Sequence, residues 1–147
     1  MKRLSMMSVA VMSVVLTAGA ATAAAGAKGK SLYDRLGGKG AITAVVDTFV
    51  GNVGGDKRIN GYFATTDIPK LKMHLVNQIC EAAGGPCTYT GRTMKQTHAG
   101  MGVDEAAFNA LVEDLVKALD HHKVGKAEKD ELLGILGPMK SDIVEKK

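Results

Sequence analysis

Apolar side chains recur every three or four residues along most of this chain, which is the spacing of amphipathic helices. No segment alternates apolar and polar residues with the two-residue period of a strand. Glycines and capping residues separate the helical segments, and Pro138 is expected to kink the last of them. The pattern predicts an all-α domain. The predicted helices cover residues 32–36, 39–53, 67 to the Gly84-Gly85-Pro86 corner, 93–99, 104–119 and 127–144.

The N-terminal stretch has a different pattern from the rest of the chain. Lys2 and Arg3 precede an apolar run at residues 6–16, and a tract of small residues follows at 18–27. This order is typical of a secretory signal peptide, and the apolar run is too short to span a bilayer permanently. We therefore expect an exported protein, periplasmic in a bacterium or otherwise extracytoplasmic. An uncleaved membrane anchor is the alternative.

Cleavage near Ala25 would leave residues 26–30 as a linker and residues 31–147 as one folded domain. The formal charge of +4 then falls to about +2 without a stripe of lysine or arginine, which argues against a nucleic-acid partner. No remaining segment is apolar enough to cross a membrane. The mature chain has three Phe, three Tyr, no Trp and many glycines, so it is short of large core side chains.

Histidine is the most informative residue type for chemistry. His74 lies on an apolar face of its predicted helix, where a histidine is more often a core residue than a ligand. His98 ends a very short helix just before a glycine, and a neutral imidazole there can reach the interior. His121 and His122 end a helix, and we interpret them as solvated capping residues.

The two cysteines exclude several classes of site. Cys80 and Cys87 do not form a Cys-x-x-Cys pair, which argues against a redox dithiol, a zinc knuckle or covalent attachment of a c-type haem. The chain reverses between them at the glycine corner, and an exported protein meets oxidising conditions, so we expect a Cys80–Cys87 disulfide. Two separate buried thiols are the alternative.

Several short motifs together resemble one known family. In order along the chain, these motifs are Leu32-Tyr33-Asp34-Arg35-Leu36-Gly37-Gly38, Tyr62-Phe63, Gly84-Gly85-Pro86, the run from Tyr89 to Lys95, and His98-Ala99-Gly100-Met101-Gly102-Val103. Their spacing resembles that of the truncated haemoglobins of group I over residues 31–144. The resemblance implies a two-over-two helical sandwich, shortened from the globin fold, that encloses non-covalent haem b.

The same resemblance implies roles for individual residues. His98 matches the proximal iron ligand, and Phe63 matches a phenylalanine that packs on the porphyrin. Other residues of the implied haem site are listed by expected position. They are Leu71 and Leu75 on the distal side, Met94, Val112, Leu115, Leu136 and Met139 around the ring, and Tyr89 with Lys70, Lys72 or Arg92 near the propionates.

The departures from the family pattern concern the distal side. Val50 stands where many relatives have a tyrosine beside the bound gas, and Leu75 stands where many have a glutamine. His74 matches a position where some relatives have a histidine that binds iron as a sixth ligand. Three roles stay open for His74, in order of preference: iron ligand, donor to bound gas or propionate, and inert helix residue. The last helix lacks the histidine that links haem covalently in cyanobacterial relatives.

These features favour a monomeric, exported haem b globin that reversibly binds O2, NO or CO and rests as a bis-histidine complex of His98 and His74. The same haem also fits single-electron transfer with an electron-donor protein, or NO detoxification. We make no commitment to an enzyme, although NO dioxygenase or peroxidase side activity fits the resemblance. The alternative from another class is a cofactor-free helical interaction module, in which both histidines are ordinary core residues.

Overall fold

A computed structural model describes residues 29–146 of the chain, and the predicted signal peptide lies outside this range. The described part is helical, and its one strand-like feature is an isolated bridge between Asp104 and Lys146. The elements are α1 (Leu32–Leu36), α2 (Gly38–Gly55), the 3-10 helix η2 (Asn60–Phe63), α3 (Ile68–Ala82), α4 (Met94–His98), α5 (Glu105–His121), α6 (Lys126–Leu136), the 3-10 turn η3 (Gly137–Met139) and α7 (Lys140–Ile143).

Local capping explains where several helices begin. The Asp67 carboxylate accepts a hydrogen bond from the Lys70 amide at the start of α3, and Asp104 accepts one from Ala107 at the start of α5. Short α4 begins with a complete capping box, in which Thr93 and Gln96 satisfy each other's backbone amides. These contacts fix the helix starts from within a few residues of sequence.

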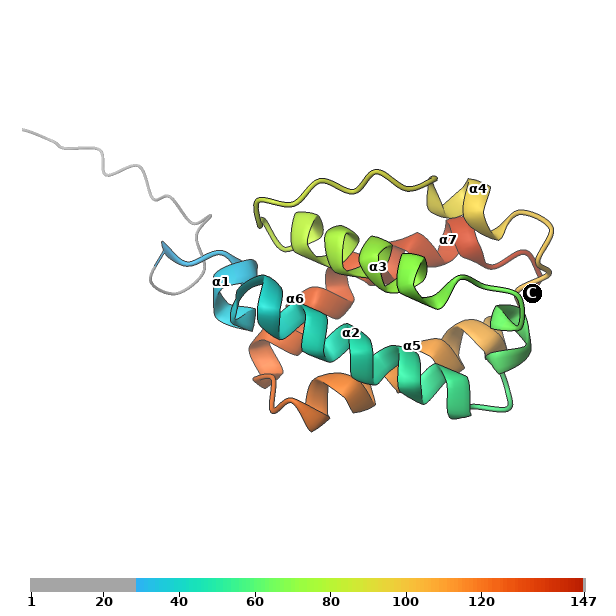
Figure 1. Ribbon diagram of the computed structural model, residues 1–147, viewed down its shortest axis with the longest axis horizontal. Helices are drawn as coiled ribbons and strands as arrows, with labels where there is room; N and C mark the ends of the chain where they lie inside the picture. Colours follow the sequence, from blue (N-terminus) through green and yellow to red (C-terminus); the bar gives the residue numbers. More distant parts are fainter. Residues whose placement is uncertain (1–28, 147) are drawn as a thin grey trace, which may run out of the picture.

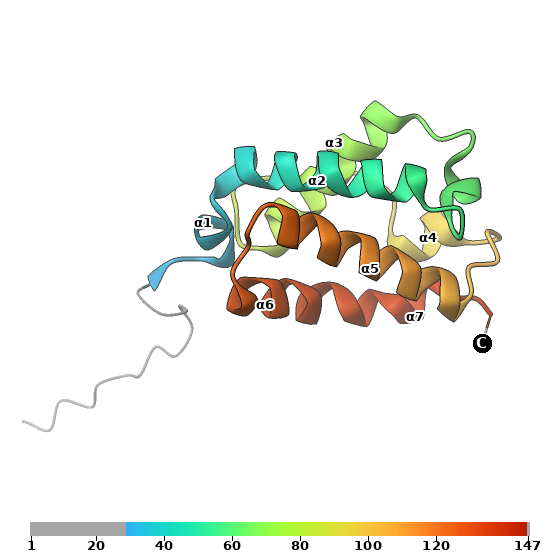
Figure 2. The same ribbon diagram turned by 90° about the horizontal axis from the view of Figure 1, so that it is seen from below.

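Two helix pairs form the fold. Helix α2 packs against both α3 and α5, and α4 packs against α7 (Figure 1). Viewed from below, α2 and α3 lie over α5 and the α6–α7 segment (Figure 2). The expected all-α, two-over-two sandwich is therefore confirmed. No helix within residues 29–146 combines the length and apolarity needed to cross a membrane.

The last predicted helix differs from expectation. A single helix with a kink was predicted over 127–144, but the structure divides this region into α6, η3 and α7. Pro138 lies inside the 3-10 turn, where its missing amide removes a helical hydrogen bond. The break is therefore larger than a kink.

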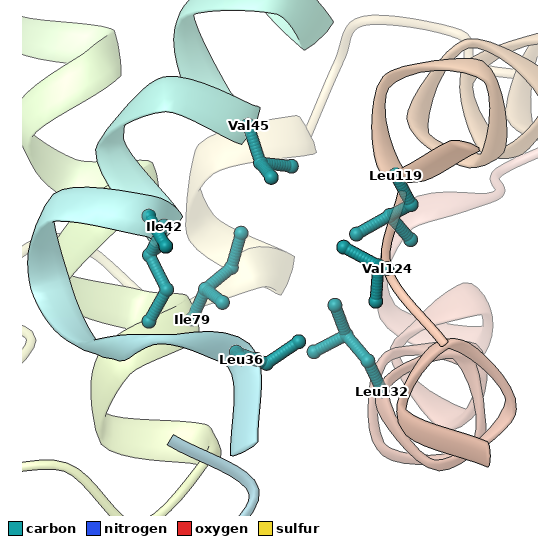
Figure 3. A pocket seen from close by; sticks show the side chains of 8 residues that line it. Leu36, Ile42, Val45, Ile79, Leu119, Val124 and Leu132 are labelled. Carbon is teal, nitrogen blue, oxygen red and sulfur yellow. The ribbon is translucent and has the colours of Figure 1, made fainter. Parts of the chain in front are cut away.

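The fully buried core lies where α2, α5 and α6 meet. Val46, Leu119 and Leu132 are almost completely buried there. A small pocket beside them is lined only by apolar side chains of α1, α2, α3, α5, α6 and the α5–α6 loop, seven of which are labelled in Figure 3. Its volume of about 10 Å³ is near the minimum for one water molecule, so it is a packing defect rather than a ligand site.

Candidate haem site

His98 is oriented by its own helix. Its Nδ1 atom lies 2.7 Å from the carbonyl oxygen of Met94, which can only accept a hydrogen bond. Nδ1 therefore carries the proton and Nε2 keeps its lone pair. Because α4 packs against α7, the half-buried imidazole is held at one end of the sandwich. A histidine with this tautomer is prepared to bind a metal through Nε2.

His74 lies on α3 and is also half-buried. Its Nδ1 atom is buried and has no hydrogen-bond partner in the described part of the chain. Buried polar nitrogens are nearly always paired, so this one needs an explanation. An interaction with a group outside the polypeptide supplies one. The ring also packs edge-on against Tyr89, with ring centroids 5.8 Å apart and planes inclined by 76°.

The apolar residues expected around the haem share one property. They pack against the core without being buried in it, although they come from six different elements. Leu115 is the exception, since it is buried within the core cluster. Half-buried apolar side chains that line several helices fit an apolar group placed between those helices. The half-buried members are Phe63 on η2, Leu71 and Leu75 on α3, Met94 on α4, Val112 on α5, and Leu136 and Met139 on α6 and η3.

One contact across the sandwich was not anticipated. The Gln78 amide on α3 lies 3.7 Å from the sulfur of Met139 on η3, a donor–acceptor distance typical of a weak hydrogen bond to sulfur. Gln78 lies four residues, about one helical turn, beyond His74, so the two side chains share one face of α3. The helical spacing could have indicated Gln78, but no sequence signal indicates its partner on η3.

The candidates for the propionates are in different environments. Lys72 forms an ion pair with Asp47 on α2 at 3.1 Å. The Tyr89 hydroxyl donates to the Arg92 carbonyl at 2.7 Å, and burial raises the pKa of this phenol. Lys70 and Arg92 are exposed. Lys72 and Tyr89 thus already have partners, while Lys70 and Arg92 present their charges to solvent.

The two positions where many relatives have a distal tyrosine and glutamine carry no hydrogen-bond donor here. Val50 is buried on α2 and Leu75 is half-buried on α3, and these two helices pack together. His74 is therefore the titratable side chain that α3 contributes to this region. Two of its three candidate roles, iron ligand and donor to bound gas or propionate, need the ring to face this interior.

His121 and His122 lie far from these residues along the fold. Their rings contact each other at 5.0 Å, and the Nε2 atom of His122 lies 2.7 Å from the Thr48 hydroxyl. Both are exposed at the end of α5, as expected for solvated capping residues. They contribute nothing to the candidate site.

Cys80 and Cys87 are joined by a disulfide, with their Cα atoms 5.7 Å apart. The bridge ties the last turn of α3 to the loop that leads to Tyr89. Gly85 lies inside this loop, and a Cβ there would come within 2.4 Å of Tyr33 and 2.8 Å of the Cys80 sulfur. The corner therefore requires glycine for close approach.

Comparison with known proteins decides the family. The family model described as bacterial-like globin matches residues 31–145. The chain is 36% identical over 113 residues to the group 1 truncated hemoglobin GlbN of Mycolicibacterium paratuberculosis, covering 77% of this chain and 83% of that protein. This chain belongs to the group 1 truncated haemoglobins. It is also 34% identical to GlbN of Nostoc sp., covering 79% of this chain and 98% of the relative.

Solved structures agree with this membership. The Fe(III) form of truncated hemoglobin from Tetrahymena pyriformis superposes with a TM-score of 0.75 at 28% identity, covering 78% of this chain and 98% of that one. The 2/2 hemoglobin from Synechococcus sp. gives a TM-score of 0.73 at 33% identity with the same coverage. That crystal structure is described as a cyanomet state with covalently attached heme. The truncated haemoglobin described here has no histidine on α6, η3 or α7.

Proposed function

We propose that this truncated haemoglobin holds non-covalent haem b through His98, with His74 as the second axial ligand in the resting state, and reversibly binds O2, NO or CO. Family membership makes it a haem-binding globin for diatomic ligands. The observation that carries the axial assignment is the pair of imidazoles: Nδ1 of His98 donates to the Met94 carbonyl, whereas Nδ1 of His74 is buried without a hydrogen-bond partner in residues 29–146. Haem, when bound, supplies the iron at which a diatomic ligand is held.

The remaining side chains bind, orient and exclude water. The half-buried apolar residues of α3, α4, α5 and η3 provide contact surface for the porphyrin. Of the cations that the resemblance places near the propionates, Lys70 and Arg92 are favoured, because they form no ion pair within residues 29–146 whereas Lys72 pairs with Asp47. Non-covalent attachment is supported by a sequence with no histidine after His122 and no Cys-x-x-Cys-His motif.

The lack of distal donors favours ligand binding or electron transfer over catalysis. Val50 and Leu75 offer no hydroxyl or amide to a bound ligand, and such donors are what stabilise developing negative charge in a catalytic site. A sixth ligand that must leave before a gas can bind also lowers the apparent affinity for the gas. The second candidate function is single-electron transfer, which the same two histidines favour and which requires an electron-donor protein.

We also propose that the protein acts outside the cytoplasm, in the periplasm if the source is bacterial. This proposal depends on the N-terminal sequence, with its basic start, apolar run and small-residue tract. The Cys80–Cys87 disulfide supports it, because disulfides persist in oxidising compartments. Fractionation of cells that express the full chain, followed by mass measurement of its mature N-terminus, tests it; an intact Met1 in the cytoplasmic fraction contradicts it.

Absorption spectra of the haem-loaded protein test the axial assignment. The wild type should show a low-spin, six-coordinate spectrum in both ferric and ferrous states. His74→Ala should become high-spin and five-coordinate, and His98→Ala should lose most of its haem. His121→Ala is the matched control, because this exposed ring should leave every band unchanged.

Three results would contradict the proposal. A five-coordinate wild type would remove His74 as a ligand, and a Soret band unaffected by His98→Ala would remove His98. A colourless protein that takes up no haem would instead support the cofactor-free interaction module.

A further inference from the structure

The Tyr89 ring is the best-defined neighbour of His74. The two rings meet edge-to-face at a centroid distance of 5.8 Å, a geometry that aromatic pairs prefer. Nδ1 of His74 has no hydrogen-bond partner within residues 29–146, so no hydrogen bond from this part of the protein to Nδ1 sets the angle of the ring. Metal-binding histidines are usually oriented by a hydrogen bond from the protein. At His74, packing against Tyr89 is the orienting contact that the described residues supply.

Tyr89 is itself fixed from several directions. Its amide donates to a Glu81 carboxylate oxygen at 3.2 Å, and its hydroxyl donates to the Arg92 carbonyl at 2.7 Å. A Cβ on Gly91 would come within 2.4 Å of the Tyr89 hydroxyl oxygen, so the ring lies directly over this glycine. Tyr89 therefore has one defined position, although it lies in a loop without regular structure.

The disulfide anchors this loop to the helix that carries His74. Cys80 is completely buried in the last turn of α3, and Cys87 precedes Tyr89 by two residues. Because Cys80 and His74 share one helix, the bridge fixes the loop relative to the histidine. His74, the bridge and Tyr89 thus form a closed structural unit at one side of the candidate site.

We propose that Tyr89 is the positioning residue for His74, and that the Cys80–Cys87 bridge holds Tyr89 in that role. In this arrangement the loop controls how readily His74 gives up its place to an external ligand. Tyr89 is not assigned to a propionate, because its hydroxyl is bonded to the Arg92 carbonyl. The inference rests on the proposed function for the identity of the axial ligand, but the contact between the two rings does not depend on it.

The first test is the rate at which CO replaces His74 in the ferrous holoprotein, followed by stopped-flow absorbance. Tyr89→Leu should raise this rate by about 2- to 12-fold, the factor expected from loss of one aromatic contact. Gly91→Ala should raise it as well, because the new methyl group displaces the Tyr89 ring without removing it. The double variant Cys80→Ala/Cys87→Ala should also raise the rate at which CO replaces His74.

Two controls separate positioning from general loosening. Tyr89→Phe keeps the ring that contacts His74 and loses only the hydrogen bond to the Arg92 carbonyl, so its rate should lie between those of the wild type and Tyr89→Leu. Tyr33→Leu removes another half-buried ring, one that lies against Gly85 rather than against His74. It should leave the CO rate unchanged even if it lowers the stability of the fold. An equal effect of Tyr33→Leu and Tyr89→Leu would overturn the inference.

The second test does not require His74 to be a ligand. In the diamagnetic CO complex, the ring-proton NMR signals of His74 should be shifted by the ring current of Tyr89. Tyr89→Leu should move these signals, whereas Tyr33→Leu should not. If the wild-type spectrum is five-coordinate, the bis-histidine proposal fails and this measurement still decides the inference. Signals of His74 that do not respond to Tyr89→Leu would overturn it, whatever the coordination state.

Discussion

The Nδ1 atom of His98 lies 2.7 Å from the carbonyl oxygen of Met94, one helical turn earlier. The carbonyl belongs to the first residue of α4 and the imidazole to its last, so this short helix itself sets the tautomer of the histidine. The hydrogen bond directs Nε2 away from the helix.

Removing the His98 side chain while leaving its space should give a protein that needs added imidazole to bind haem. His98→Gly should bind haem weakly, and millimolar imidazole should restore the Soret band, because the free ligand can occupy the vacated position. Titration of the absorbance with imidazole measures this. His122→Gly with the same additions is the control, and an equal response from both variants would contradict the assignment.

A donor introduced at Leu75 should strengthen ligand binding. In a His74→Ala background, Leu75→Gln should slow O2 dissociation by about 3- to 10-fold, the effect of one additional hydrogen bond. Leu75→Met, which is similar in size and adds no donor, should leave the rate near its starting value. Stopped-flow dissociation measures both. The prediction fails if glutamine and methionine behave alike.

Loss of the disulfide should lower the free energy of unfolding by about 2–3 kcal/mol, the cost of freeing a short closed loop. Cys80→Ala/Cys87→Ala, compared with the oxidised wild type by urea unfolding, measures this change. The reduced wild type controls for the lost packing of the buried Cys80 sulfur. No loss of stability on reduction would show that the loop is fixed by its other contacts.

Acid stability should depend on Arg58. Its guanidinium hydrogen-bonds the Asp56 carboxylate and lowers the pKa of that group from 3.8 to about 2. The resulting stabilisation is complete above about pH 4 and is lost as the pH falls toward 2. Arg58→Met should therefore lower the urea midpoint of unfolding at pH 6. Between pH 6 and pH 3, the midpoint of this variant should fall by less than that of the wild type.

The neighbouring Asp114 carboxyl changes the stability with pH in the opposite direction to Asp56. Burial raises the pKa of this carboxyl, so its contribution to stability decreases as the pH rises from 3.8 toward the raised value.

Lys126→Met is the control for Arg58→Met, since it breaks only an exposed ion pair with Asp130. Equal pH profiles for the two variants would contradict the role given to Arg58.

Two glycines should respond oppositely to alanine. Gly85→Ala should destabilise the fold by about 1–3 kcal/mol, since its Cβ would overlap Tyr33 and the Cys80 sulfur. Gly51→Ala should stabilise it by about 0.5–1 kcal/mol, because this exposed position of α2 has open space around it. Thermal unfolding of the two variants checks the signs, and a neutral Gly85→Ala would show that the corner can relax.

Much of the local structure follows from contacts within a few residues. The predicted starts at Asp67 and Asp104 coincide with observed side-chain caps. Helix α2 extends slightly beyond the predicted 39–53, because its terminal glycines continue the helical hydrogen bonds. The length of the break at Pro138 could not be predicted, since it depends on how α7 packs against α4.

The candidate site was likewise predictable from the sequence only in part. His98 could be singled out because a short capped helix and a following glycine are visible in the sequence. Burial of the His74 nitrogen, the pairing of Lys72 with Asp47 and the contact of Gln78 with Met139 were not accessible to such reasoning. All three features depend on how the helices pack together rather than on the spacing of residues along the chain.

By itself, the sequence determined the helices, their caps and the family motifs, because 3.6-residue periodicity, capping and glycine corners act over one or two turns. Only the tertiary structure decided what His74 touches. The edge-on contact with Tyr89 joins a helix to a loop 15 residues further along, and it exists because a buried disulfide and a glycine corner fold that loop back along α3. Such a contact depends on the path of the whole chain between its two residues.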